Sequence, residues 1–200
     1  WREGDRVFGI VAGGGHAEYL VTDAASVARV PSRLSWTDAA AIPEAFITAH
    51  DALIAQAAAR ADENILIHAV GSGVGLAATQ LARAWKATPY GTARTADKIE
   101  RARALGLADG VAVTADVTAI QAAVEQWTGG RGIDVTLDLL GGPYLGASIR
   151  AAAPRGRIIL IGTIAGRSAE IPVGVVLVKR LTLRGTVLRA RSVGEKRAVT

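Results

Sequence analysis

The feature that most constrains the fold is a glycine-rich loop that runs from His68 to Gly75. It follows the apolar run of residues 64–67 and precedes an alanine-rich segment, residues 76–85. A strand, a tight glycine turn and a helix in immediate succession let a phosphate approach the backbone. The N-terminus of such a helix also offers free N–H groups and the positive end of the helix dipole. The loop therefore predicts a binding site for a dinucleotide.

Beyond residue 45, runs with strand character alternate with helical segments at the spacing of βαβ units. The strand candidates cover residues 64–68, 88–93, 110–113, 133–139, 156–162 and 181–188. Helix candidates fall between the first five of these strands and cover residues 74–85, 96–105, 118–127 and 143–152. We therefore predict an α/β fold with a doubly wound parallel Rossmann sheet. Its expected strand order, numbered along these six strands, is 3-2-1-4-5-6.

The first 45 residues have a different character, with short β-like runs and no helical periodicity before residue 35. The β-like runs cover residues 6–9, 17–21 and 27–30. Ser35 to Asp38 can cap a short helix, and residues 44–60 form a strong helix candidate. This change of pattern predicts a domain boundary near residue 45.

We accordingly predict a small β-rich domain over residues 1–45 and a dinucleotide-binding domain over residues 46–188. Residues 189–200 would begin a further segment, because Ser192 to Glu195 have capping-box spacing about two turns before Thr200. The chain also opens within a strand-like run. We expect it to be a piece of a longer protein.

Arg94 indicates which dinucleotide is bound. An NAD-selective site places an acid about 20 residues beyond the glycines, and this chain has Arg94 nineteen residues past Gly75. Arg94, Lys98 and the hydroxyls of Thr92 and Thr95 suit the 2′-phosphate of NADP through charge-assisted hydrogen bonds. We predict NADPH as the cofactor. The alternative for the two cations is that they are ordinary surface charges.

Composition excludes several classes of protein. The chain has 200 residues, 50% of them hydrophobic, a net charge of +5 and no cysteine. No apolar run approaches the ~18 residues that a membrane helix needs, and disulfides and cysteine-ligated zinc are excluded within the chain. The basic residues lack the interleaved aromatic residues of single-strand binders. We expect a cytoplasmic protein that binds neither membrane nor nucleic acid.

Several short sequences together carry a resemblance to a known family. They are Ala41 to His50, Ile67 to Ala69 with Ser72 to Gly75, Asp138 to Gly142, and Arg155 to Gly162. As a set they resemble the quinone oxidoreductase (zeta-crystallin-like) branch of the zinc-free medium-chain dehydrogenase/reductase superfamily. Within that branch, Ser72 to Gly75 and Leu188 to Ser192 are most similar to the p53-inducible quinone oxidoreductase subgroup.

The resemblance implies a two-domain enzyme that uses NADPH to reduce a quinone or another activated α,β-unsaturated carbonyl by hydride transfer. Residues 1–45 would be the last part of a GroES-like catalytic domain, and Thr48 a catalytic residue that faces the nicotinamide. The implied cofactor contacts are Ser72, Gly73, Val74 and Gly75 at the pyrophosphate, Thr95 and Lys98 at the 2′-phosphate, Leu140 and Gly141 near the adenosine, and Gly162 and Thr163 near the nicotinamide. A homodimer joined through the edge strand, residues 181–188, is also implied.

Two departures from the family pattern and four alternatives remain open. Ser72 replaces the middle glycine of the loop, and Val113 stands where many members have a tyrosine. The enzyme could instead be an enoyl-thioester reductase of the same superfamily, or a noncatalytic, crystallin-like NADPH-binding protein. Thr48 could simply bond within its own helix. A zinc alcohol dehydrogenase is the near competitor, but His16, His50 and His68 lack ligand spacing, and we predict no metal.

Overall fold

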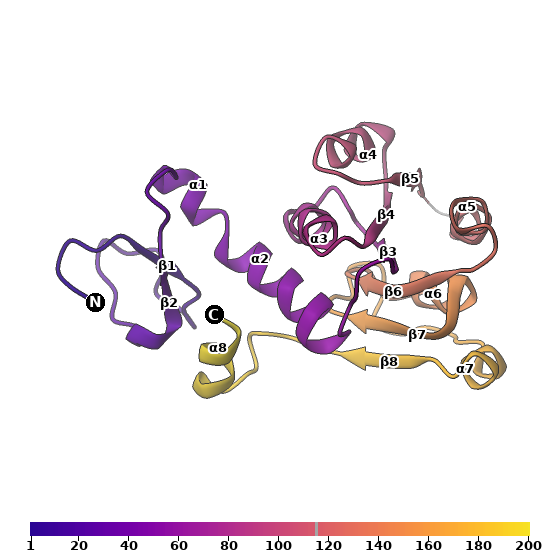
Figure 1. Cartoon of the computed structure of the whole chain (residues 1–200). Coiled ribbons are helices and arrows are strands. Elements are labelled where there is room, and N and C mark those ends of the chain that lie inside the picture. The colour runs from indigo at the N-terminus through magenta and orange to yellow at the C-terminus, as the bar shows by residue number, and fades with distance from the viewer. Residues whose placement is uncertain (115) are drawn as a thin grey trace. The chain divides into compact units, whose positions relative to one another are not determined.

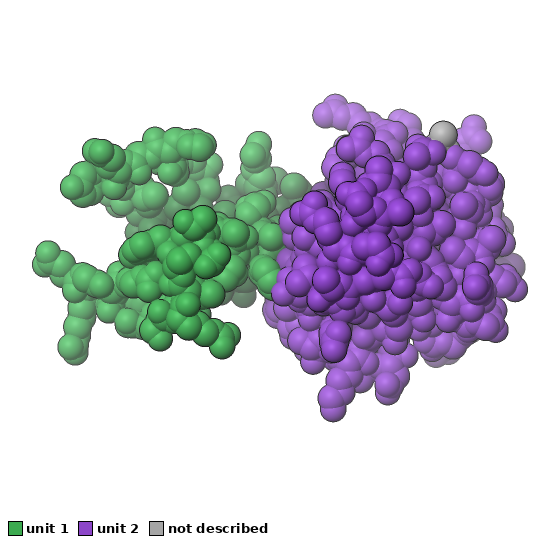
Figure 2. Space-filling model, turned by 90° about the horizontal axis from the view of Figure 1, so that it is seen from above, with its two compact units in different colours: residues 1–48, 187–200 green, residues 49–186 purple. Residues whose placement is uncertain are grey.

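The computed structural model describes residues 1–114 and 116–200 (Figure 1). The chain divides into two compact units (Figure 2). The first unit contains Trp1–Thr48 and Val187–Thr200, and the second contains Ala49–Thr186. Within the described residues, no helix is long and apolar enough to cross a membrane.

The second unit is built on a parallel six-stranded sheet with the order β5-β4-β3-β6-β7-β8 (Figure 1). Its strands are β3 (Asn64–Ile67), β4 (Thr88–Ala93), β5 (Asp109–Ala112), β6 (Ile133–Asp138), β7 (Ala152–Leu160) and β8 (Thr182–Gly185). Numbered along the chain, this is the order 3-2-1-4-5-6. The predicted α/β fold class and its strand order are therefore confirmed.

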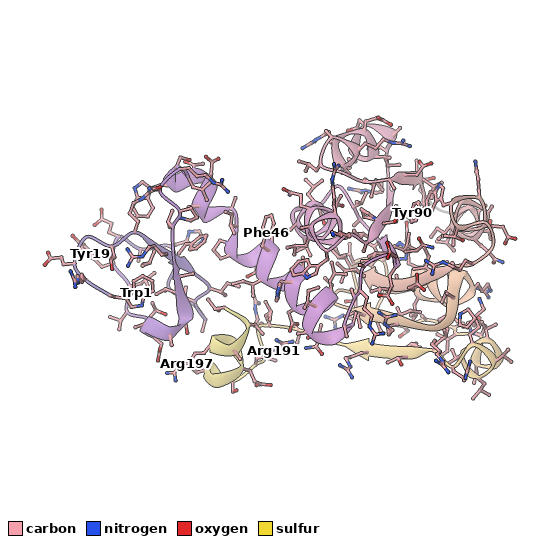
Figure 3. The ribbon with its side chains drawn as sticks, viewed as in Figure 1. Trp1, Tyr19, Phe46, Tyr90, Arg191 and Arg197 are labelled. Carbon is pink, nitrogen blue, oxygen red and sulfur yellow. The ribbon has the colours of Figure 1, made fainter. Side chains whose placement is uncertain are left out.

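Helices connect the strands and cover the sheet, which makes its centre the core of the unit. They are α3 (Gly73–Ala84), α4 (Ala96–Arg103), α5 (Thr118–Thr128), α6 (Pro143–Ala151) and α7 (Val173–Lys179). All four residues of β3 are buried, as expected for a central parallel strand covered on both faces. Tyr90 of β4, labelled in Figure 3, stacks on Trp127 of α5 at a centroid distance of 5.0 Å.

Three elements differ from the sequence prediction: the helix that leads into the second unit, strand β7 and helix α7. The helix predicted over residues 44–60 is α2 (Pro43–His50) continued by a π-helical segment, Asp51–Gln56. It ends early because Ala58 adopts a positive φ of 49°. β7 begins at Ala152, where a helix end was predicted, because Ala152 pairs with Ile133 across a register shift in the sheet.

Helix α7 was not predicted, because its sequence is poor in helix formers. It contains Gly174 and four valines, which have low helix propensity. Its end is instead fixed by backbone conformation: Arg180 adopts a left-handed φ of 54° at the C-cap. Tertiary context thus overrides local propensity in this segment.

The first unit contains a two-stranded antiparallel sheet, β1 (Val7–Gly9) with β2 (Val27–Arg29), a short 3₁₀ turn, Ala24–Ser26, and two short helices. The helices are α1 (Trp36–Ala40), capped by Ser35 as predicted, and α8 (Val193–Val199), which begins with the predicted capping box. The strand predicted over residues 17–21 is wrong. Tyr19, labelled in Figure 3, is 91% exposed and Val21 is 102% exposed, so neither side chain is packed. The GroES-like assignment of residues 1–45 stays a prediction.

Candidate functional site

A cavity of about 450 Å³ lies at the carboxyl ends of β3, β4 and β6. The chain fills the sheet from β3 to β5 on one side and then crosses to β6 on the other, so this is the point where the strand order reverses. Ligands of open α/β sheets bind at such switch points. The cavity is lined by Ala69, Gly71, Ser72, Thr92, Ala93, Arg94, Lys98, Thr114, Leu140, Tyr144, Ile164 and Ala165.

The glycine loop brings the start of α3 close to the end of β3. A Cβ on Gly75 would lie 2.6 Å from the carbonyl oxygen of Ala69 and 2.7 Å from that of Val70, so only glycine fits. Ser72 is the N-cap, and its hydroxyl accepts the N–H of Gly75 at 3.1 Å. The N–H groups of Gly73 and Val74 donate to no acceptor among the described residues. These N–H groups are available to an anion.

Two cations line the same cavity from different elements. Arg94 directly follows β4, and Lys98 lies in α4. A Cβ on Gly71 would lie 2.8 Å from Cβ of Lys98, which means that the lysine stem packs directly against the glycine loop. Neither cation forms a salt bridge within the part of the chain that the structure describes. The structure thus brings Ser72, Arg94 and Lys98 together around one cavity.

Thr95 is placed differently from these two cations. It is the exposed N-cap residue of α4 and is not among the residues that line the cavity. A hydrogen bond from the Thr95 side chain lowers the pKa of Asp97, which lies in the first turn of α4. The predicted contact between Thr95 and a 2′-phosphate stays a prediction.

The predicted residues that follow β6 and β7 lie next to one another. Leu140 lines the cavity, and its N–H and that of Gly141 donate to Oδ1 of Asp138 at 2.8 and 2.9 Å. Gly141 has a φ of 63°, and a Cβ there would lie 3.3 Å from the carbonyl oxygen of Gly162 and 3.4 Å from Cα of Thr163. Their assigned contacts with the cofactor stay predictions, although the fold gathers them at one edge of the sheet.

Sequence reasoning missed several residues that line the cavity, above all Tyr144. It lies in the first turn of α6, directly after the turn that leaves β6, and is 8% exposed. Burial raises the pKa of Tyr144, while the positive charge of Arg94 acts in the opposite direction. Its position just beyond the carboxyl end of a central strand is the signal that could have identified it. Thr92, whose hydroxyl was among the groups predicted to suit a 2′-phosphate, also lines the cavity.

Thr48 is half-buried in α2 and ends the N-terminal segment of the first unit. It is not among the residues that line the cavity. Its role beside a nicotinamide therefore stays a prediction.

The described residues contain no group of three or more His, Cys, Asp or Glu side chains that could hold a metal ion. The absence of a metal from the protein stays a prediction.

Two curated relatives and two solved structures illustrate what the chain is similar to. It is 38% identical to pikromycin polyketide synthase component PikAII of Streptomyces venezuelae, over 84% of this chain and 4% of the synthase. It is 30% identical to quinone oxidoreductase-like protein 2 of Bos taurus, over 92% of this chain and 52% of that protein.

The CurK enoyl reductase structure superposes with a TM-score of 0.80 at 30% identity, covering 93% of this chain and 55% of that one. Mycobacterial Rv1454c, solved in complex with NADPH, gives a TM-score of 0.74 at 26% identity, over 82% of this chain and 50% of that one. The chain thus spans a small part of the synthase and about half of each of the other three. Residues 73–199 match the zinc-binding dehydrogenase family. Since this match covers more than half of the sequence, the chain belongs to the zinc-binding dehydrogenase family, within the medium-chain dehydrogenase/reductase superfamily.

Proposed function

We propose that this chain forms the cofactor-binding part of an NADPH-dependent reductase that adds a hydride to a C=C bond conjugated with a carbonyl group. The observation that carries the proposal is the cavity at the switch point of the sheet. It presents Arg94 and Lys98 where an NAD-selective site would present an acid. Two cations without an ion-pair partner at this position favour a ligand with an additional phosphate group.

The donors around the cavity fit the parts of NADPH that carry charge. The first turn of α3 offers free N–H groups for the pyrophosphate, and Arg94 and Lys98 offer positive charge for the 2′-phosphate. The cavity is large enough for the adenosine part of the cofactor, since small-molecule pockets measure about 300 to 1,000 Å³. The relative solved in complex with NADPH supports the same assignment.

When bound, NADPH supplies the hydride, and the residues of this chain bind and orient it. In the proposed reaction the hydride adds to one carbon of the double bond and a proton adds to the other, so that NADPH becomes NADP⁺. Thr163 and Gly162, which lie beside the turn after β6, are the residues we assign to the nicotinamide end. Thr48 remains the proposed catalytic residue on α2.

We propose an enoyl thioester as the substrate class. Similarity to a structure named as an enoyl reductase and to polyketide synthases supports this substrate more than it supports a quinone. The first expectation from the sequence was quinone reduction, with the enoyl thioester as its alternative, and the comparisons favour the reverse order. Quinone reduction stays the second candidate because 92% of this chain also aligns with a quinone oxidoreductase-like protein, over 52% of that protein.

The two substrates are distinguished by stopped-flow oxidation of NADPH by the intact protein. We expect a crotonyl thioester to be reduced with a kcat/KM at least tenfold above that for 1,4-benzoquinone, with a protein-free blank for the direct reaction of the quinone. Turnover of the quinone alone would favour the second candidate. Tight binding of NADPH without turnover of either compound would indicate a noncatalytic NADPH-binding protein.

We also propose that the protein forms a homodimer through β8. This strand is the edge of the sheet, and an exposed edge is a natural pairing surface. Helix α7, which precedes β8, has no buried residue and exposes Val173, Leu177 and Val178. A second copy that pairs with β8 would cover part of this apolar surface.

A further inference from the structure

A fully buried histidine lies behind the cavity, at the carboxyl end of β3. The Nδ1 atom of His68 is 2.9 Å from the hydroxyl oxygen of Thr92 in β4, and its Nε2 atom is 2.8 Å from the hydroxyl oxygen of Ser148 in α6. Both ring nitrogens therefore have a partner, and each partner comes from a different element. His68 has no exposed surface and does not line the cavity.

The hydrogen bonds of Ser148 determine where the proton of the imidazole lies. The hydroxyl of Ser148 donates to the carbonyl oxygen of Tyr144 at 2.9 Å, so its oxygen accepts from His68. The proton of a neutral His68 is then on Nε2. The Nδ1 atom can only accept, and the hydroxyl of Thr92 must donate to it.

The surroundings keep His68 neutral. Burial lowers its pKa to about 4, although the negative charge of Asp138 acts in the opposite direction. The ring of Tyr144 meets the imidazole edge-on at a centroid distance of 5.1 Å. At neutral pH the acceptor on Nδ1 and the donor on Nε2 are therefore both fixed.

The two ends of this hydrogen-bond chain belong to different walls of the cavity. Thr92 lines one wall, and Arg94 follows it by two residues; Tyr144 lines another wall and provides the carbonyl group that orients Ser148. One imidazole thus connects the end of β4 with the first turns of α6. Within the described residues, the Thr92 hydroxyl has no side-chain hydrogen bond other than the one to His68.

We propose that His68 is a positioning residue of the nucleotide cavity: through the hydroxyl of Thr92 it holds the end of β4, and with it Arg94, in the geometry that receives the 2′-phosphate side of NADPH. This inference rests on the proposed function as an NADPH-dependent protein. His68 itself touches no ligand in this account.

Two amide variants separate the two ends of the imidazole. In His68→Asn the side-chain oxygen stands near the position of Nδ1 and can still accept from Thr92. In His68→Gln the amide nitrogen stands near the position of Nε2 and can still donate to Ser148. No acceptor is then left near Nδ1 for the hydroxyl of Thr92. Binding of adenosine 2′,5′-bisphosphate and of NADPH to the intact protein is measured by calorimetry, and thermal unfolding reports whether each variant is folded.

We expect His68→Gln to raise the Kd of both ligands about tenfold, the value of one hydrogen bond, and His68→Asn to raise it less than about threefold. Thr92→Val should match His68→Gln, and Thr92→Ser should keep the affinity of the unchanged protein. If Thr92 acts through His68, the double variant His68→Gln with Thr92→Val should bind no more weakly than either single variant.

A different pattern would overturn the proposal. Equal affinity in the folded Gln and Asn variants, whether reduced or unchanged, would assign His68 a role in stability alone. Additive effects in the double variant would mean that Thr92 acts on the ligand without His68. If the unchanged protein binds neither NADPH nor the bisphosphate, the proposed function fails, and this inference fails with it.

Discussion

The central strand β3 and helix α7, which precedes the edge strand β8, are both mostly apolar but have opposite surroundings. All four residues of β3 are buried, and the strand ends at a cavity lined by charged and polar groups. Helix α7 is almost entirely apolar, yet none of its residues is buried, and β8 beside it is mostly exposed. The comparison shows that apolar composition alone does not place a segment in the core. The centre is completed by this chain, whereas the edge leaves apolar surface in contact with solvent.

The difference also divides the proposed roles. At the centre, the proposed specificity depends on Arg94, Lys98 and Thr92, which line one cavity, and the buried His68 holds the hydroxyl of Thr92. At the edge, the one charged residue of α7, Lys179, donates to the carbonyl oxygens of Arg150 and Ala152 and does not face the cavity. The exposed apolar residues of α7 suit association with another apolar surface. Substitutions in the two regions should therefore change different measurements.

The largest effect is expected at the cavity. Replacing Arg94 and Lys98 together with alanine should weaken NADPH binding by several kcal/mol, at ~1.5 to 3 kcal/mol for each charged hydrogen bond, and should spare NADH. Arg101→Ala is the matched control, since Arg101 is an exposed cation of the same helix that does not line the cavity. Calorimetric titration checks both variants. Unchanged NADPH affinity in the double variant would contradict the assignment of Arg94 and Lys98 to the 2′-phosphate.

Stability should depend on pH through His68. Its pKa is about 4 in the folded protein and close to 6.5 in the unfolded chain. Between these two pH values the unfolded state binds a proton that the folded state does not. The contribution of neutral His68 to the free energy of unfolding is fully present above about pH 6.5. It is lost as the pH falls to 4, at about 1.4 kcal/mol per pH unit and about 3 kcal/mol in all.

The measurement is the free energy of unfolding of the unchanged protein and of His68→Asn between pH 4 and 8. The difference between the two curves isolates His68 from Asp138 and other carboxylates. It should shrink as the pH falls. A difference that stays constant over this range would show that His68 is not buried in its neutral form.

Two glycine substitutions compare the centre with the edge directly. Gly75→Ala places a Cβ within 2.6 to 2.7 Å of backbone atoms of Ala69 and Val70, and should destabilise the fold by about 1 to 3 kcal/mol. Gly174→Ala in α7 meets nothing within 4 Å and should stabilise the helix by about 0.5 to 1 kcal/mol. Denaturant unfolding measures both. Equal costs would contradict the packing described at the glycine loop.

The smallest change in stability is expected at α7. Leu177→Asp should alter the free energy of unfolding of a single chain by less than about 0.5 kcal/mol, because Leu177 is 71% exposed. It should nevertheless convert the proposed dimer into a monomer in light scattering. Val21→Asp, a charge at a fully exposed position of the first unit, should leave the mass unchanged. A monomeric unchanged protein would refute the dimer.

The sequence predicted the sheet well because the signal for each strand is local. Runs such as Asn64–Ile67 are short, apolar and bounded by turn residues, and their alternation with helices leaves one usual strand order. The exposed segment 17–21 was predicted as a strand because its residues have β propensity, but propensity cannot provide a pairing partner. Helix α7 was missed because its residues have low helix propensity, although its tertiary surroundings make the segment helical.

The cavity could be predicted only in part. Ser72, Arg94, Lys98 and Leu140 follow from motif positions along the chain, and all four line the cavity. Tyr144, Ile164 and the buried link from Thr92 through His68 to Ser148 depend on how α6 and the segment after β7 pack against the strand ends. Such contacts join residues up to 80 positions apart and leave no periodic signal in the sequence.

Calorimetric titration of the unmodified, intact protein with NADPH and with NADH tests the central claim most directly. With Arg94 and Lys98 at the cavity, NADPH should bind at least about tenfold more tightly than NADH, since a single charged hydrogen bond to the 2′-phosphate contributes about 1.5 kcal/mol or more. Equal affinity for the two cofactors, or tighter binding of NADH, would contradict the account.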